Sequence, residues 1–148
     1  NCLLVDFGGN YRNYNTDMTR TIHFGEPSDE FKRVYEIVLE ANRRGKLAAK
    51  AGNQLQDVDR AARSYIASQG YGPYFTHRTG HGIGIDGHEG PSAGEGETTL
   101  IQTGMAFSVE PGIYLPGKFG VRIEDQILIT ETGTRVLHDF SRELMVIK

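Results

Sequence analysis

The stretch VEPGIYLPGKFGVRIE, residues 109–124, decides how the second half of this chain folds. Two apolar segments flank a turn signal centred on Gly117, and this pattern predicts an antiparallel hairpin. If the turn is symmetric, residues whose numbers sum to 234 lie opposite one another. Glu110 then faces Glu124 across the hairpin, and each acid sits in an otherwise apolar strand.

A second hairpin of the same kind is predicted at the start of the chain. An apolar run at residues 3–7 is followed by a turn signal at residues 8–10, and a strand rich in Thr and Ile returns over residues 15–24. Folding about Tyr11 and Arg12 places Asp6 opposite Asp17. A bulge in either hairpin would shift its register by one residue.

Two pairs of facing acids need a physical explanation. Like charges directly opposite each other on a sheet repel by up to about 1 kcal/mol at the surface, and by more when buried. Divalent cations between the carboxylates would reverse this repulsion, because the ions become the largest local charges. A single acid in a strand is more often exposed or ion-paired, so the acids alone leave both interpretations open.

The rest of the chain predicts an α+β fold of antiparallel hairpins with two helices packed on one face. One helix begins after Ser28, a candidate N-cap, and runs to about residue 51; the other covers residues 54–69. We interpret both helices as scaffold without chemistry. Further strands are expected at residues 105–110, 120–130, 134–137 and 143–147. We expect residues 1–148 to form one domain.

Composition excludes several classes of protein. The 148 residues carry a net charge of −3 and 38% apolar residues, which fits a globular protein without a basic surface for nucleic acid or an anionic membrane. No apolar stretch reaches the about 18 residues of a membrane span, and no signal-peptide pattern opens the chain. The lone cysteine, Cys2, permits no internal disulfide, so we expect a cytoplasmic protein.

The first residues predict that other sequence precedes this chain. Asn1 is not an initiator methionine, and an apolar strand is already under way at Cys2. A buried strand at the first residue indicates that earlier sequence was removed, by design or by proteolysis.

Three of the five histidines, His77, His81 and His88, lie close together in a glycine-rich segment. Glycines let the backbone approach a ligand closely. The segment lacks the strand, lysine and helix context of a phosphate-binding loop. His23 and His138 stand elsewhere without polar neighbours, and we interpret them as surface or edge residues.

The clustered histidines suit a metal centre built with the four acids. One imidazole beside four carboxylates fits Mn²⁺, Co²⁺, Fe²⁺ or Zn²⁺, and hard oxygen ligands favour Mn²⁺. The remaining histidines are suited to acid–base work or to hydrogen bonding with a developing oxyanion.

Five segments of the chain carry a resemblance to a known family. They are VDFG at residues 5–8, DMTRT at 17–21, HRTGHGIG at 77–84, VEPGIY at 109–114 and VRIED at 121–125. In order and spacing they resemble the pita-bread metallopeptidases, most closely the Xaa-Pro branch of prolidase and aminopeptidase P. The resemblance covers nearly the whole chain. It implies a creatinase/aminopeptidase-like fold, truncated at its N-terminus, with a curved antiparallel sheet and helices on its outer face.

The resemblance also implies a metal centre and its chemistry. Two divalent ions, with Mn²⁺ favoured over Co²⁺, Zn²⁺ or Fe²⁺, would be held by Asp6, Asp17, His81, Glu110 and Glu124. Asp17 and Glu124 would bridge the ions, Asp6 would bind one, and His81 with Glu110 the other. A hydroxide activated by both ions would attack the scissile carbonyl, and Glu110 would accept its proton.

Further residues take roles from the same resemblance. His88 would stabilise the tetrahedral intermediate, and His77 would contact the proline side of the substrate. Tyr114 and Arg122 are distinctive of the Xaa-Pro branch and would help to bind the substrate. Arg122 also shares a strand face with Glu124, where it could brace the carboxylates. Thr19 and Arg20 are interpreted as structural, and Gly8 as a site of close packing.

The chain departs from the family in length. The first half of the catalytic domain, which carries another active-site histidine, is missing, as is the upstream domain that restricts substrate length. We expect the longer parent to be an active homodimer acting on proline-containing di- or oligopeptides. This piece alone should be weak or inactive, and the missing N-terminal segment could associate as a separate fragment.

Three other interpretations compete with an Xaa-Pro dipeptidase or aminopeptidase. A methionine aminopeptidase would share the five ligands, but Tyr114, Arg122 and residues 77–80 argue against it. A non-catalytic pita-bread binding module would typically have lost metal ligands, and none is lost here. A metal-free scaffold fragment is the remaining alternative. The sequence does not separate dipeptidase from aminopeptidase.

Overall fold

A long antiparallel hairpin opens the computed structural model, which describes all residues, 1–148. Its strands are β1 (Cys2–Tyr11) and β2 (Tyr14–Phe24). The turn lies at Arg12 and Asn13, which both have positive φ, as a two-residue hairpin loop requires. The predicted turn about Tyr11 and Arg12 was therefore wrong, and residues 8–10 lie within β1 rather than in a turn.

This turn changes which residues face each other in the first hairpin. Asp6 pairs with Thr19, and Asp17 pairs with Gly8, so the predicted pairing of Asp6 with Asp17 was wrong by two positions. Because side chains alternate with a period of two, a two-residue shift keeps both acids on the same face. Asp6 and Asp17 are thus diagonal neighbours instead of opposite residues.

Two helices follow the hairpin, α1 (Asp29–Ala48) and α2 (Leu55–Ser68). Ser28 is the N-cap of α1, and its hydroxyl accepts a hydrogen bond from the Phe31 N–H at 3.2 Å, as predicted. Gln54 and Asp57 form a capping box at the start of α2. The predicted helix positions are confirmed, although α1 ends three residues earlier than expected.

The second half of the chain supplies most of the sheet. A five-stranded sheet has the order β4-β3-β5-β8-β9, β6 pairs with β7, and β10 joins β2 in parallel. The bounds are β3 (Gly80–Gly82), β4 (Glu89–Ala93), β5 (Ala106–Val109), β6 (Gly112–Leu115), β7 (Phe119–Arg122), β8 (Asp125–Thr130), β9 (Gly133–Val136) and β10 (Met145–Ile147), with a 3-10 helix at Gly72–Tyr74. Strands β3 and β4 and the short helix lay in a region without periodicity and were not predicted.

The hairpin about Gly117 has the predicted register. Gly112 pairs with Arg122 in β6 and β7, and Val109 pairs with Asp125 in β5 and β8. The residue numbers of both pairs sum to 234, so the two ladders share one register. Between them the pairing is interrupted for two residues on each strand. Glu110 and Glu124 lie in this interruption and face each other, as expected.

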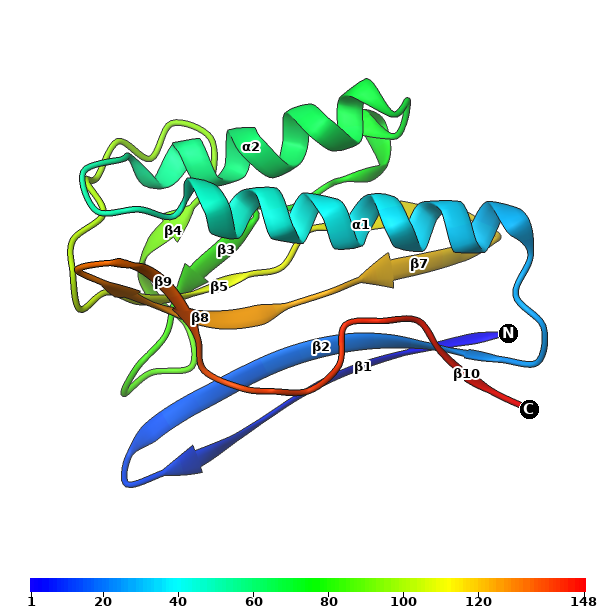
Figure 1. The fold of residues 1–148 in the computed structure, drawn as a ribbon, viewed down its shortest axis with the longest axis horizontal. Helices are drawn as coiled ribbons and strands as arrows, with labels where there is room; N and C mark the ends of the chain where they lie inside the picture. Colours follow the sequence, from blue (N-terminus) through cyan, green and yellow to red (C-terminus); the bar gives the residue numbers. More distant parts are fainter.

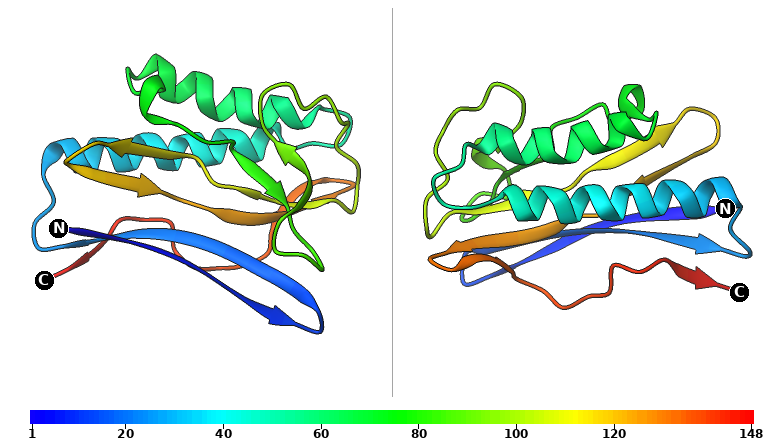
Figure 2. Two further views of the ribbon diagram at one scale, coloured as in Figure 1. Left: turned by 180° about the vertical axis from the view of Figure 1, so that it is seen from behind. Right: turned by 45° about the horizontal axis from the view of Figure 1, so that its top comes forward.

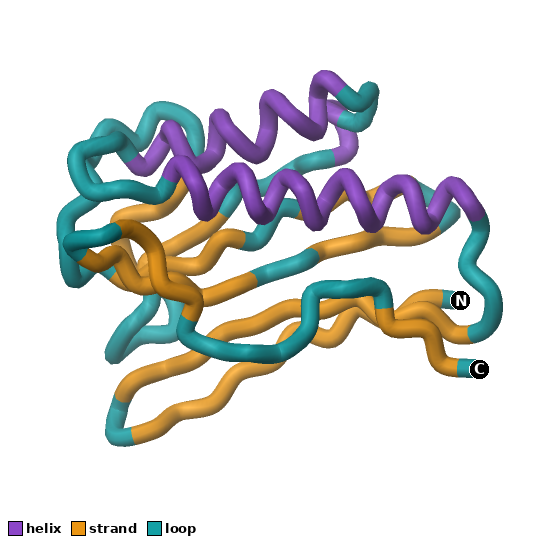
Figure 3. Tube along the Cα trace, viewed as in Figure 1, coloured by secondary structure: helices purple, strands orange, loops and turns teal.

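The helices and the first hairpin lie on different sides of the central strands (Figures 1 and 2). One apolar cluster joins α1 and α2 to the β6–β7 hairpin, and a second lies between the start of α2 and strands β5 and β8. Figure 3 shows the strands gathered beneath the two helices. Neither helix has the length and apolar character needed to cross a membrane.

Candidate metal centre

The five predicted ligands come from five separate strands or strand ends. Asp6 lies on β1, Asp17 on β2 and His81 on β3, while Glu110 follows β5 and Glu124 precedes β8. Ligand atoms of Asp17, His81 and Glu124 all lie within 4.8 Å of one another. His81 Nε2 is 3.6 Å from Asp17 Oδ2 and 3.4 Å from Glu110 Oε1. Residues separated by more than 100 positions thus meet at one point.

Asp6 stands at the margin of this group. Its side chain is 48% exposed, and its Oδ2 is ion-paired with Arg122 Nη2. It is nevertheless close enough to Asp17 to raise the pKa of that carboxyl, after the larger effect of burial. Asp6 therefore belongs to the cluster but is held mainly by Arg122.

Burial makes the two glutamates reluctant to ionise. Burial raises the pKa of Glu110 to about 7. Burial, and then the neighbouring charge of Glu110, raise the pKa of Glu124 to about 8. Strongly raised pKa values in a cluster of acids are typical of functional sites.

Glu124 supplies the test of whether these residues fit a metal ion. Its side chain is 2% exposed. Thr19 donates a hydrogen bond to Oε2 at 2.5 Å, but Oε1 is buried with no hydrogen-bond partner. An unpartnered buried carboxylate oxygen is costly, and a cation would satisfy it. The donor set of carboxylates and one imidazole fits a divalent ion.

The tautomer of His81 also suits metal binding. Its Nδ1 lies 2.9 Å from the Gly82 carbonyl oxygen, which can only accept. Nδ1 must therefore carry a hydrogen, which leaves Nε2, the nitrogen that faces Asp17 and Glu110, as the one available to bind a metal ion. A second hydrogen bond of this kind orients histidine ligands in metal sites.

His77 and His88 flank the cluster on the open side. The Tyr114 hydroxyl lies 2.7 Å from His77 Nε2, while His77 Nδ1 lies 2.7 Å from the Arg78 carbonyl. Burial lowers the pKa of His77, which favours the neutral ring. The exposed His88 stacks on His81 with ring centroids 3.9 Å apart. A cavity of about 420 Å³ opens between them, lined by His77, Arg78, His81, His88, Glu110 and Arg122.

Arg122 contacts one acid of the cluster directly and a second one through Thr19. Its guanidinium pairs with Asp6 and donates to Thr19 Oγ1 at 3.2 Å and to the Tyr114 hydroxyl at 3.3 Å. Thr19 in turn holds Glu124. Arg122 therefore connects a carboxylate of β1, a hydroxyl of β2 and the tyrosine beside His77.

Arg20 and Gly8 have the structural roles expected of them. Arg20 is buried and donates to the carbonyls of Thr19 and Glu124 and to Asp125 Oδ1. Asp125 also pairs with Lys46 and Arg142, and although burial opposes its ionisation, these cations lower its pKa to about 2. A Cβ on Gly8 would lie 1.9 Å from the Thr16 carbonyl oxygen, so only glycine fits there.

The interpretation of His23 and His138 was wrong. His23 is 8% exposed, packs on the Phe31 ring at 4.6 Å and lies on the central strand of its sheet. His138 lies 3.6 Å from Asp125 Oδ1, so it has charged neighbours. Both contacts depend on how neighbouring elements pack against each other, so local sequence pattern does not reveal them.

Helix α2 contributes a polar anchor that the sequence interpretation missed. Asp59 is fully buried and pairs with Arg63 one turn later. Its Oδ1 accepts from the Thr79 N–H at 3.1 Å and hydroxyl at 2.8 Å, and Arg63 donates to the His77 carbonyl at 2.6 Å. The pair thus fixes the segment leading into His81. Asp59 could have been found as an acid within the apolar face of the helix.

Replacing Asp59 with alanine is expected to lower the free energy of unfolding by about 3–5 kcal/mol, because the Arg63 charge and two Thr79 donors lose their partner. Urea unfolding of the variant measures this loss. Asp57→Ala in the first turn of the same helix is the control, and it should cost only about 1 kcal/mol as a capping residue. Equal losses would contradict the anchoring role of Asp59.

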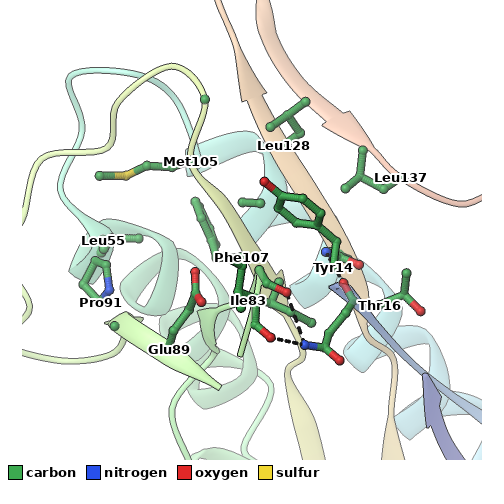
Figure 4. A pocket seen from close by; sticks show the side chains of 18 of the residues that line it. Tyr14, Thr16, Leu55, Ile83, Glu89, Pro91, Met105, Phe107, Leu128 and Leu137 are labelled. Carbon is green, nitrogen blue, oxygen red and sulfur yellow. Dashed lines mark hydrogen bonds between the residues drawn. The ribbon is translucent and has the colours of Figure 1, made fainter. Parts of the chain in front are cut away.

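A larger cavity of about 790 Å³ lies away from the acids, between the tip of the first hairpin and strands β5 and β8 (Figure 4). Tyr14, Met105, Phe107 and Leu128 are among its mostly apolar lining residues. Asn15 Nδ2 donates to the Gly84 and Ile85 carbonyls at its edge. None of the five predicted ligands lines it, so its size does not mark it as the reactive site.

Carboxylates and an imidazole from several strands thus form a candidate site for divalent metal ions. A model of metallopeptidase family M24 matches residues 1–131, and the chain belongs to this family.

Relatives within the family carry Xaa-Pro names. The Xaa-Pro dipeptidase of Pyrococcus horikoshii is 46% identical over 143 residues, which cover 97% of this chain and 41% of that protein. The structure of an Xaa-Pro dipeptidase from Bacillus anthracis matches with a TM-score of 0.96 and 48% identity, over 99% of this chain and 41% of that one. An X-Pro aminopeptidase from Thermotoga maritima matches with a TM-score of 0.95 and 44% identity, over 99% and 41%. The predicted pita-bread fold is confirmed, and the chain spans less than half of these relatives.

Proposed function

We propose that the protein containing this chain hydrolyses the peptide bond in front of proline, using two divalent metal ions held by Asp6, Asp17, His81, Glu110 and Glu124. The observation that carries the proposal is the buried, unpartnered Oε1 of Glu124, a residue that has a carboxylate oxygen within 4.8 Å of ligand atoms of Asp17 and His81. The Xaa-Pro names of relatives at 46–48% identity support the substrate class.

Each acid has a distinct place in this proposal. Asp17 and Glu124 lie at the middle of the cluster and would be shared by both ions, with Asp6 on one side and His81 with Glu110 on the other. Bound divalent ions lower the pKa of a coordinated water and polarise a carbonyl. Glu110 would accept the proton, because its carboxylate lies 3.4 Å from His81 and also lines the open cavity in which the substrate would lie.

The residues around the open cavity bind the substrate. Neutral His77, fixed by Tyr114 and the Arg78 carbonyl, faces the proline side. His88 is exposed above His81 and donates a hydrogen bond to the oxygen that becomes negative during attack. Arg122 keeps Tyr114 and Asp6 in place rather than contacting the reacting bond.

Hard carboxylate oxygens outnumber the single imidazole, and we therefore propose Mn²⁺ as the metal. Dialysis of the metal-free full-length protein against Mn²⁺, followed by metal analysis, should give two ions per chain. Higher peptidase activity with Zn²⁺ than with Mn²⁺ would contradict the choice of metal, while no binding of any ion would overturn the proposed function.

Peptide hydrolysis tests the substrate. The full-length protein with Mn²⁺ should cleave Ala-Pro or a longer Xaa-Pro peptide and leave the matched Ala-Ala peptides intact. Activity on the dipeptide alone would identify a dipeptidase, and activity on the longer peptide an aminopeptidase. Residues 1–148 assayed alone should be weak or inactive. Equal cleavage of the Ala-Ala and Ala-Pro peptides would contradict the proline preference.

A further inference from the structure

The strand pairing that carries both glutamates is interrupted at Pro111. The pairs on either side share one register, which places Pro111 opposite Ile123. The Ile123 N–H donates to the Pro111 carbonyl at 3.4 Å. In an antiparallel ladder the reciprocal bond would run from residue 111 to the Ile123 carbonyl, but proline has no N–H. The carbonyl directly before Glu124 is therefore left without its ladder donor.

A side chain from helix α1 supplies the missing donor. Asn42 is fully buried, and its Nδ2 donates to the Ile123 carbonyl at 3.2 Å and to the Val109 carbonyl at 2.8 Å. Each of these carbonyls belongs to the residue directly before a glutamate of the cluster. The two N–H groups of one amide thus hold both strands at the point where their ladder is broken.

The orientation of Asn42 is fixed by chemistry. Two carbonyl oxygens can only accept, so the amide nitrogen must face them. Its Oδ1 is buried with no hydrogen-bond partner. An apolar residue of similar size would fill this place without that desolvation cost. Packing alone therefore does not explain why an amide side chain occupies this position. The need of the Val109 and Ile123 carbonyls for hydrogen-bond donors does explain it.

Glutamates 110 and 124 are each tied on their other side as well. The Glu110 N–H donates to the Thr79 carbonyl at 2.7 Å, and the Glu124 N–H donates to the Thr19 carbonyl at 3.1 Å. Their backbones are thus fixed between neighbouring strands on one side and α1 on the other. Removing the helix contact would let both backbones relax together, since Asn42 is common to them.

We propose that Asn42 is a positioning residue of the metal centre, which sets the separation and orientation of Glu110 and Glu124 through the carbonyls before them. The inference rests on the proposed metal-binding function. Helix α1 would then contribute to the metal centre, although its apolar periodicity indicates only a helix that packs against the sheet.

The test uses the full-length protein with Asn42→Leu, which keeps the size and removes both donors. Mn²⁺ affinity should fall about 10–100-fold, the range found when groups that orient metal ligands are lost. Val34→Ala is the matched control, because it removes buried methyl groups from the same face of α1 without touching a hydrogen bond. The control should lower the melting temperature and leave Mn²⁺ affinity within about twofold. Asn42→Leu that weakens Mn²⁺ binding no more than Val34→Ala would overturn the proposal.

A second readout does not depend on metal. In the metal-free protein, Asn42→Leu should speed hydrogen exchange of the Glu110 and Glu124 amides at least tenfold relative to Val34→Ala. Unchanged exchange at both amides would refute the positioning role even if the wild type bound metal. Conversely, the wild type could bind no metal while the Glu110 and Glu124 amides still exchange faster in Asn42→Leu than in Val34→Ala. That result would refute the proposed function alone.

A rescue variant tests the chemical reason. Pro111→Ala restores an N–H opposite the Ile123 carbonyl, so Asn42→Leu/Pro111→Ala should bind Mn²⁺ at least threefold more tightly than Asn42→Leu. A change in packing at position 42 would not be repaired from position 111. Absence of any recovery would show that the Ile123 carbonyl does not need the donor that Asn42 provides.

Discussion

Replacing Glu124 with glutamine in the full-length protein is expected to lower the hydrolysis of an Xaa-Pro peptide by at least about 100-fold, the upper effect of changing groups that only orient metal ligands. Glutamine keeps the size and the acceptor for the Thr19 hydroxyl, but it loses the negative charge at the centre of the cluster. Steady-state kinetics with saturating Mn²⁺, together with metal analysis, measures the loss.

The same substitution should stabilise the metal-free protein at high pH. The pKa of Glu124 in the folded state is about 8, compared with an ordinary value of 4.5, so ionising this side chain in the folded protein costs free energy. Since one pKa unit equals about 1.4 kcal/mol, the ionised side chain lowers the free energy of unfolding by at most about 5 kcal/mol above pH 8. Removing it should therefore raise stability while activity falls.

Glu131→Gln is the control for both measurements. Glu131 is an exposed glutamate in the turn that follows β8, so its replacement should change neither activity nor stability appreciably. A Glu124→Gln protein that kept wild-type activity, or that was less stable than wild type at pH 9 without metal, would contradict the assigned role of this carboxylate.

The hairpin about Gly117 was predictable because its loop is symmetric and its turn signal is local. The first hairpin was not, because its turn uses Arg12 and Asn13 with positive φ instead of glycine. The glycines at positions 8 and 9 indicated a turn that is not there. Gly8 lies within β1, where the Thr16 carbonyl comes too close to leave room for a side chain. The register differed from the predicted one by two residues, so Asp6 and Asp17 still lie on the same face of the hairpin and the predicted site was unaffected.

The positions that order the site were harder to predict than the ligands. Asn42 and Asp59 occupy buried positions on α1 and α2, where helical periodicity shows only an apolar face. Their partners, such as the Ile123 carbonyl and the Thr79 N–H, are backbone groups far along the chain. The sequence does show a polar residue at a position of each helix where the periodicity predicts an apolar one. This pattern indicates that the residue is buried, but it does not reveal which group the side chain contacts.

The metal-free protein is expected to lose stability as pH rises from about 5 to 8. Folded-state pKa values of about 7 for Glu110 and about 8 for Glu124 lie above the unfolded value of 4.5. Between these values the folded state binds more protons than the unfolded state, so the free energy of unfolding falls with rising pH. The pKa of Asp17 is raised as well and adds to the fall at lower pH. Asp125, with its pKa near 2, stabilises the fold throughout this window and loses that effect only in strong acid.

Bound Mn²⁺ should reverse this slope, because metal ligands must be deprotonated and binding stabilises the folded state more strongly as pH rises. Urea unfolding at pH 5, 6, 7 and 8, with EDTA or with excess Mn²⁺, measures both slopes. Glu124→Gln should flatten the slope in EDTA and leave little stabilisation by Mn²⁺. A metal-free wild type whose stability fell no more steeply from pH 5 to 8 than that of Glu124→Gln would mean that Glu124 ionises freely. In that case the cluster would have no need of a cation, and the electrostatic reason for the metal centre would be lost.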